Sequence, residues 1–144
     1  MALSFLPAAE GDIPVIIAQA QDLIVRYEDA AAVDLREALA WTGRKIAKHL
    51  HEYVRVARNG ETCAFVRRCA DGELDDLYVL PQFRGQGIGS AVLEWCLKQA
   101  DAPPYFYVFT RNTRAIALYR RFGFELCETV SPTRAIMRMN FQKN

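Results

Sequence analysis

The feature that most restricts the fold of this chain is a block of strand-like sequence interrupted by two tight-turn signals. Asn59-Gly60 is a strong two-residue hairpin signal, Asp71-Gly72 marks a second turn, and YVRVA at residues 53–57 alternates apolar and polar residues. Pro81 has no backbone N–H to donate, so it ends the third segment. The block therefore predicts three consecutive antiparallel strands, at residues 53–57, 62–68 and 73–80.

The sequence on either side of this block has mainly helical spacing. Asp12 and Asp34 are plausible N-caps of two helices. Their apolar stripes recur at spacings of three and four and contain Ile13, Ile16, Ile17, Ala20 and Ile24 in the first helix and Leu35, Leu39, Thr42, Ile46 and Leu50 in the second. Before these helices, a first strand is predicted within residues 1–9. After the block, the sequence predicts a helix at 88–100, a strand at 105–110 and a helix at 113–121 that is stopped by Gly123. Two strands, ELCETV and RAIMRMNF, follow around Ser131-Pro132.

Size and composition limit the class of protein. A length of 144 residues suits one domain spanning residues 1–144, and no apolar run approaches the roughly 20 residues of a membrane span. Net charge is +1 with mixed signs along the chain, which argues against a nucleic-acid partner. With no basic leader at the start, we expect a soluble, cytoplasmic protein that does not bind membranes.

The cysteines and histidines give no sign of a metal site. Cys63, Cys69, Cys96 and Cys127 contain no C-x-x-C pair and no histidine at ligand spacing, so we expect neither zinc nor disulfides but reduced, mostly buried thiols. His49 and His51 are two residues apart, which points them to different faces of a helix. Both are expected on the solvent side at a helix end.

Closely spaced glycines follow the third predicted strand. Gly85, Gly87 and Gly89 stand where the helix at 88–100 begins, so backbone N–H groups are exposed beside the positive end of the helix dipole. A P-loop is disfavoured because no lysine separates Gly89 from Ser90, and a Rossmann fingerprint because the spacing is G-x-G-x-G after antiparallel strands. The glycines alone indicate either a phosphate site or a plain strand-to-helix turn.

Two motifs together resemble one family. The segment RGQGIG at residues 84–89 is similar to the R/Q-x-x-G-x-G/A pyrophosphate loop of the GNAT acetyltransferases, and the preceding LYVLP resembles their cofactor-binding strand. Residues 112–124 match the family's N-x-x-A-x-x-L-Y-x-x-x-G-F pattern. The resemblance covers residues 12–139 and implies the GNAT fold. That fold is α+β in three α/β/α layers, with a mixed, mostly antiparallel sheet of six or seven strands and about four helices.

The resemblance also implies a binding site for acetyl-CoA. The strand at 77–79 and the strand from Tyr105 are expected to splay apart, leaving backbone groups for the pantetheine arm. The Val79 N–H is then placed to stabilise the thioester oxyanion, and Asn112 both contacts the cofactor and caps the helix at 113–121. The implied cofactor-binding residues are Leu77, Tyr78, Val79, Arg84, Gly85, Gln86, Gly87, Ile88, Gly89, Ser90 and Asn112.

Tyr119 resembles the family's general acid, which protonates the departing CoA thiolate. A phenol with a pKa near ~10 keeps its proton at neutral pH and can donate it to a thiolate. The alternative for Tyr119 is a core position beside Phe122 and Phe124.

Three carboxylates are candidates for the general base, Glu73, Asp75 and Asp76. Strict alternation puts Glu73 and Asp75 on one face with Leu77 and Val79, and Asp76 on the other. Glu73 resembles the catalytic glutamate of histone-type members and is the preferred base. In the ribosomal-protein N-terminal acetyltransferases the base lies five residues before the asparagine, where this chain has Tyr107.

The implied reaction is transfer of an acetyl group from acetyl-CoA to a primary amine by direct attack, and the alternative is a module that binds acyl-CoA without turnover. The acceptor is a small-molecule amine or a protein or peptide amine, with Tyr27, Trp41, the Glu52 region and the Ser131-Pro132 connection as candidate contacts. Exposed edge strands near the carboxyl end allow a homodimer. A cluster of arginines, on the CoA phosphate or on a solvated face, contains Arg111, Arg114, Arg120 and Arg121.

Overall fold

The computed structural model describes residues 2–139, except for the side chain of Asp76. Its elements follow the predicted order, with short 3-10 turns η1 (Glu10–Asp12), η2 (Leu50–Glu52) and η3 (Pro81–Phe83) between them. The strands and helices are β1 (Leu3–Pro7), α1 (Ile13–Tyr27), α2 (Leu35–Lys48), β2 (Tyr53–Arg58), β3 (Glu61–Arg68), β4 (Leu74–Val79), α3 (Ile88–Gln99), β5 (Tyr105–Phe109), α4 (Thr113–Arg121), β6 (Glu125–Ser131) and β7 (Arg134–Arg138). Residues 140 and 141 of the last predicted strand lie outside the described part.

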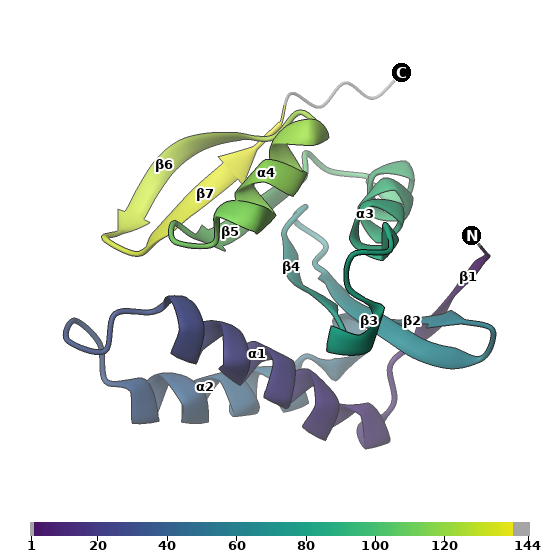
Figure 1. Ribbon diagram of the computed structural model, residues 1–144, viewed down its shortest axis with the longest axis horizontal. Coiled ribbons are helices and arrows are strands. Elements are labelled where there is room, and N and C mark those ends of the chain that lie inside the picture. Colours follow the sequence, from purple (N-terminus) through teal and green to yellow (C-terminus); the bar gives the residue numbers. More distant parts are fainter. Residues whose placement is uncertain (1, 140–144) are drawn as a thin grey trace.

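The strands form two antiparallel sheets, β1-β2-β3-β4 and β5-β7-β6. The sheets touch where β4 and β5 begin, through a parallel bridge between Glu73 and Tyr105 and a 3.1 Å bond from the Tyr105 N–H to the Gly72 carbonyl. Helices α1 and α2 cover one face of the first sheet, α3 covers the other, and α4 covers the second sheet (Figure 1). This arrangement confirms the predicted layered α+β fold.

Helix caps were predicted with one error. The Asp34 carboxylate accepts from the Glu37 N–H at 3.3 Å, as expected of an N-cap. Asp12 precedes α1 but does not cap it, because its carboxylate accepts from the Ala9 N–H at 2.8 Å and closes the η1 turn instead. Toward the other end of the chain, α4 ends at Arg121, and Gly123 follows its C-cap Phe122 with a φ of +94°, which suits a residue without a Cβ.

A bulge in β4 overturns one prediction about side-chain direction. Phe65 pairs with Tyr78 and Arg67 with Asp75, so three steps along β4 oppose two along β3. The extra residue reverses the alternation, and Asp75 therefore shares a face with Tyr78. Val79 lies on the opposite face, so the expectation that Asp75 and Val79 share a face was wrong.

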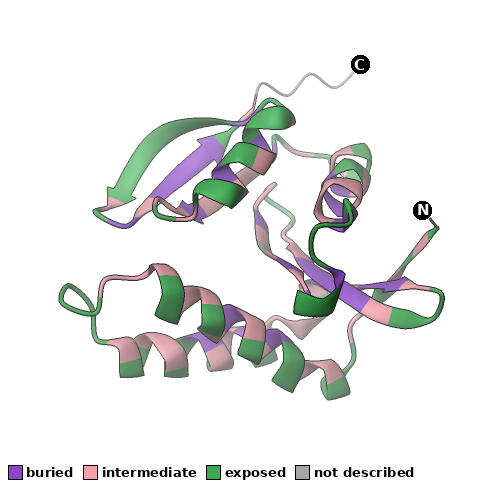
Figure 2. Cartoon of the chain, viewed as in Figure 1, coloured by how far each residue is buried: buried purple, intermediate pink, exposed green. Residues whose placement is uncertain are grey.

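The core lies between the helices and the inner faces of both sheets (Figure 2). Edge strand β6 is exposed along nearly its whole length, whereas its neighbour β7 is mostly buried. All four cysteines are free thiols, but only Cys63 and Cys96 are buried and Cys127 is exposed, so the expectation of mostly buried thiols was half right. Within residues 2–139 no helix is both long and apolar enough to cross a membrane.

Candidate active site

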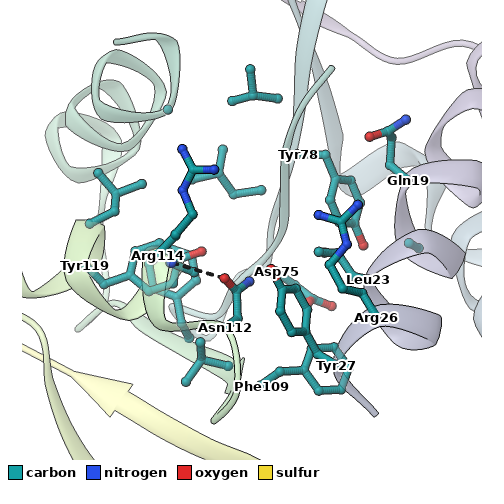
Figure 3. A pocket seen from close by; sticks show the side chains of 18 of the residues that line it. Gln19, Leu23, Arg26, Tyr27, Asp75, Tyr78, Phe109, Asn112, Arg114 and Tyr119 are labelled. Atoms are coloured by element: carbon teal, nitrogen blue, oxygen red, sulfur yellow. Dashed lines mark hydrogen bonds between the residues drawn. The ribbon is translucent and has the colours of Figure 1, made fainter. Parts of the chain in front are cut away.

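A cleft of about 620 Å³ opens where β4 and β5 diverge from their shared start, and α1 and α2 close its far side (Figure 3). Most of the predicted site residues line it together. They are Leu77, Tyr78, Val79, Arg84, Gly85, Gly87, Ile88, Gly89, Ser90, Asn112 and Tyr119. Two predicted residues are not among the described residues that line the cleft. Gln86 is exposed and donates to the Gln82 carbonyl at 3.3 Å, and the half-buried Glu73 immediately precedes β4.

The glycine turn is built by backbone that other residues adopt poorly. Gly85 and Gly87 have φ values of +75° and +79°, and Gly87 is the N-cap residue of α3. The first N–H groups of a helix have no intrahelical partner, so those of residues 88–90 are open at this end. A Cβ on Gly89 would be 3.5 Å from Leu118 Cδ2 and 3.7 Å from Val79 Cγ2, both ordinary contacts. Packing alone therefore does not require glycine at position 89.

The direction of the Val79 backbone follows from its neighbour. The Leu80 N–H donates to the Cys63 carbonyl on β3 at 2.9 Å, so the Val79 N–H and carbonyl point to the other edge of β4, toward the cleft. The Arg84 Nε donates to that Val79 carbonyl at 3.1 Å. Arg84, which the family resemblance implied as a cofactor-binding residue, thus contacts a backbone group on the open edge of the strand.

Tyr119 packs in the core and also lines the cleft. Its ring stacks on Phe106 at 3.9 Å with an interplanar angle of 9°, and the side chain also lines the cleft. Asn112, which precedes α4, also has a structural contact and a place in the cleft lining. Its Oδ1 accepts from the Ala115 N–H at 3.2 Å and so caps α4, and the residue lines the cleft.

Asp75 is the β4 carboxylate among those lining the cleft. Its Oδ2 accepts from Lys45 Nζ at 3.0 Å and from Arg67 Nη1 at 3.2 Å. Arg67 also binds Glu52 at 2.8 Å, and His49 Nδ1 lies 3.1 Å from the same Glu52 oxygen. The Glu52 region therefore does not line the cleft as expected but orients Arg67 behind Asp75.

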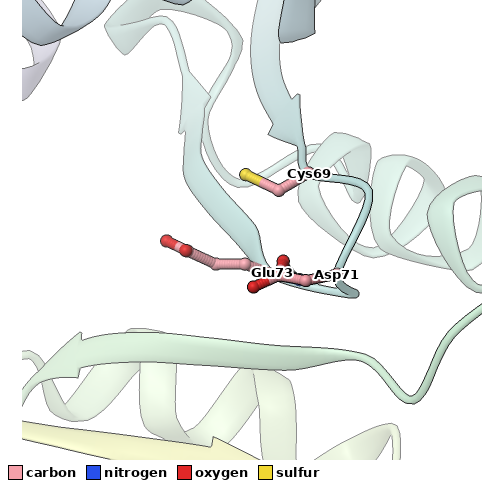
Figure 4. Close-up of side chains that lie close together, drawn as sticks. All are labelled: Cys69, Asp71 and Glu73. Carbon is pink, nitrogen blue, oxygen red and sulfur yellow. Dashed lines mark hydrogen bonds between the residues drawn. The ribbon is translucent and has the colours of Figure 1, made fainter.

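Glu73 lies beside Cys69 and Asp71, with the possible ligand atoms of the three residues within 4.8 Å of one another (Figure 4). Burial, and then the charge of Asp75, raise the pKa of the half-buried Glu73 carboxyl. Burial also raises the pKa of the Cys69 thiol to about 12, so the thiol keeps a proton that a metal ion would have to displace. Asp71 accepts from the Tyr105 hydroxyl at 2.7 Å, which lowers the Asp71 pKa.

Two of the four candidate acceptor contacts line the cleft. Tyr27 and Trp41 line it, with Tyr27 stacked on Phe109 at 6.3 Å. The Ser131-Pro132 connection approaches the end of α1 through a hydrogen bond from Thr133 Oγ1 to the Glu28 carboxylate.

The arginine cluster divides between the cleft and solvent. Arg114 and Arg121 line the cleft, whereas Arg120 lies 3.8 Å from Glu125 and Arg111 is exposed. Lys45 and Arg134 also line the cleft, and the sequence analysis did not single them out.

Comparison with known proteins identifies the family of this chain. The family model described as Acetyltransferase (GNAT) domain matches residues 49–126, just over half of the chain. The chain belongs to the GNAT acetyltransferase family. An uncharacterised protein of Mycobacterium leprae is 36% identical over 100 residues, which is 67% of this chain and 26% of that protein. An uncharacterised N-acetyltransferase of Methanocaldococcus jannaschii is 37% identical over 62 residues, which is 40% of this chain and 27% of that protein.

This GNAT chain thus spans about a quarter of the length of the curated relatives it matches. Among solved structures, the PaiA N-acetyltransferase of Thermoplasma acidophilum in complex with coenzyme A has a TM-score of 0.69 and 17% sequence identity. That similarity covers 98% of this chain and all of the other, and at 17% identity it shows the fold alone.

Proposed function

We propose that this GNAT chain transfers an acetyl group from acetyl-CoA to the nitrogen of a primary amine by direct attack. One observation carries the proposal. A single cleft is lined by the N-terminal turn of α3, the outward-facing backbone of Val79 and the hydroxyl-bearing side chain of Tyr119. A phosphate site, a pairing edge and an acid therefore face one space, and an acyl-CoA needs all three.

In this proposal the donor lies across the cleft with its pyrophosphate on the N–H groups of residues 88–90. The pantetheine arm then runs between β4 and β5 and pairs with the free edge of β4. Because Arg84 Nε donates to the Val79 carbonyl, the arm competes with Arg84 for this group. Release of Arg84 turns its charge toward the incoming phosphates.

The chemical step is one addition and one elimination. The amine nitrogen attacks the thioester carbonyl carbon, and the Val79 N–H stabilises the negative oxygen of the tetrahedral intermediate. The C–S bond then breaks, and the CoA thiolate takes a proton from the Tyr119 hydroxyl. The amine loses one proton to a base, which leaves an N-acetyl amine and free CoA.

Glu73 is the proposed base, and its raised pKa supports this role because an ordinary carboxylate is too weak a base for an ammonium. Since Glu73 is not among the residues lining the cleft, the proton travels through water. Asp75 is the alternative, and it is nearer, but Lys45 and Arg67 already occupy its carboxylate.

Free-thiol release from acetyl-CoA in the presence of an amine panel tests the proposal. The catalytic proposal expects thiol release that depends on an amine and saturates with both substrates. A module that binds acyl-CoA without turnover would instead be stabilised by CoA in a thermal melt while releasing no thiol with any amine. Absence of both stabilisation and thiol release would contradict the donor assignment itself.

A further inference from the structure

A row of aromatic rings on β5 faces away from α4, and arginines of β7 lie over it. The Arg138 guanidinium is 4.8 Å from the centre of the Tyr105 ring. The Arg134 guanidinium is 5.5 Å from the centre of the Tyr107 ring and 5.4 Å from that of Phe109. The strand register explains the pattern, because Tyr105 pairs with Arg138 and Phe109 with Arg134. Of the two arginines, only Arg134 is among the described residues lining the cleft.

Arg134 is half-buried, whereas Arg84, Arg114 and Arg121, which also line the cleft and have no carboxylate within 4.0 Å among the described residues, are exposed. Lys45 pairs with Asp75, and Arg26 pairs with Asp22 at 3.0 Å. Within residues 2–139 no carboxylate lies within 4.0 Å of the Arg134 guanidinium, and its buried Nε has no hydrogen-bond acceptor. Aromatic rings stabilise a cation less than an anion does, so this guanidinium is left without its best partner.

The surroundings of Arg134 favour a ligand anion over an internal one. Glu28 is the acidic residue that lines this side of the cleft, and its carboxylate already accepts from Thr133 Oγ1 and from the Asp29 N–H at 3.0 Å. The Tyr107 and Phe109 rings limit the positions open to the guanidinium, which lowers the entropy lost when it binds a planar group.

We propose that Arg134 binds the carboxylate of the acceptor, so that the substrate is a small amine bearing its own carboxylate, as an amino acid does. This inference rests on the acetyl transfer proposed above. An Arg–carboxylate pair with two parallel hydrogen bonds would satisfy the guanidinium and fix one end of the acceptor. The amine at the other end is then held between Arg134 on the second sheet and the acidic residues at the start of β4, Glu73 and Asp75.

The test compares amino acids with their own carboxamides as acceptors, with thiol release as the readout. The two differ by one charge, and the amide is the more reactive amine at neutral pH because its ammonium loses a proton more readily. We expect the carboxylate form to have a kcat/KM about tenfold or more above that of the amide. Arg134→Gln should bring the two within about twofold, and Arg134→Lys should restore part of the preference.

Arg138→Gln is the matched control, because Arg138 is on the same strand and over a ring of the same row but outside the cleft lining. It should leave the preference unchanged. Equal use of acids and amides, or equal losses for both in Arg134→Gln, would overturn the inference while the proposed acetyl transfer stands. A CoA-dependent thermal shift in Arg134→Gln equal to that of the parent establishes that the variant is folded.

A binding measurement covers the case in which no acceptor is turned over. Titration of the CoA-bound protein with N-acetyl amino acids and with their amides should show tighter binding of the carboxylate form, abolished in Arg134→Gln. That result without any thiol release would keep the carboxylate site and refute the catalysis. Equal binding of both forms would refute the site.

Discussion

The two halves of the cleft are built in different ways. The proposed donor half, around the start of α3 and the edge of β4, contains the glycine turn and the outward-facing backbone of Val79. The proposed acceptor half, between α1, α2 and the second sheet, contains side chains such as Tyr27, Trp41 and Arg134. A backbone site needs particular residues at fixed spacing and so leaves a motif, whereas a side-chain site draws on residues far apart in the sequence. The difference explains why the sequence indicates a donor but no particular acceptor.

The largest expected effect falls where the halves meet, at Tyr119. Tyr119→Phe keeps the ring that stacks on Phe106 but removes the proposed acid, so kcat should fall by about 10²-fold or more with little change in acetyl-CoA affinity. Steady-state kinetics and calorimetric titration of the donor measure the two effects. Tyr105→Phe is the control, since its hydroxyl binds Asp71 rather than the cleft, and unchanged turnover in Tyr119→Phe would remove the assignment.

A smaller effect shows whether Gly87 is needed for CoA binding or only for the backbone conformation of its turn. Gly87 and Gly60 both have a φ of +79°, so alanine at either position should cost about 1–2 kcal/mol of folding stability. Only Gly87 lines the cleft, so Gly87→Ala should also weaken CoA binding by about tenfold, or 1.4 kcal/mol. Urea unfolding and titration with CoA give the two numbers for each variant. If Gly87→Ala and the parent protein bound CoA with equal affinity, the glycine turn would serve folding alone.

The smallest effect concerns Glu73 and pH. Folding raises the pKa of this carboxyl above its ordinary 4.5, so its charged form opposes folding, and stability falls as the pH rises from about 4.5 through the raised pKa. Glu73→Gln should therefore melt higher than the parent at pH 7, by less than about 3 °C, and the gain should vanish below pH 4.5. Thermal melts from pH 4 to 8 measure it, with the exposed Glu94→Gln as a control.

The same variant tests the base from the opposite direction. If Glu73 accepts the proton of the amine, Glu73→Gln loses turnover at pH 7 while gaining stability. A purely structural Glu73 would gain stability with turnover intact. Asp75→Asn serves as the comparison, because loss of turnover there alone would move the role to the carboxylate held by Lys45 and Arg67.

The sequence predicted the elements whose signals are local. Asn59-Gly60 forms the expected turn, with φ values of 53° and 79°, and Asn112 caps α4 as expected. The bulge in β4 could not be predicted, because an alternating pattern does not record an unpaired residue. The chain of ion pairs from Lys45 through Asp75 to Arg67 also escaped prediction, since it joins residues on three elements. Arg134 looked like one polar position in an alternating strand, and only the fold shows which face it occupies.

The bulge in β4 decides which backbone groups of that strand face the cleft, independently of the side chains. If the same residues paired with β3 in unbroken register from Asp75 opposite Arg67, Val79 would lie opposite Cys63 instead of Ala64. Hydrogen-bonded and non-bonded positions alternate along an antiparallel pair, so its N–H would then turn into the sheet. Loss of the bulge at constant length would thus close the edge of β4 that faces the cleft. Deletion of one residue between Asp75 and Tyr78 would instead keep Val79 opposite Ala64, with its N–H on the open edge.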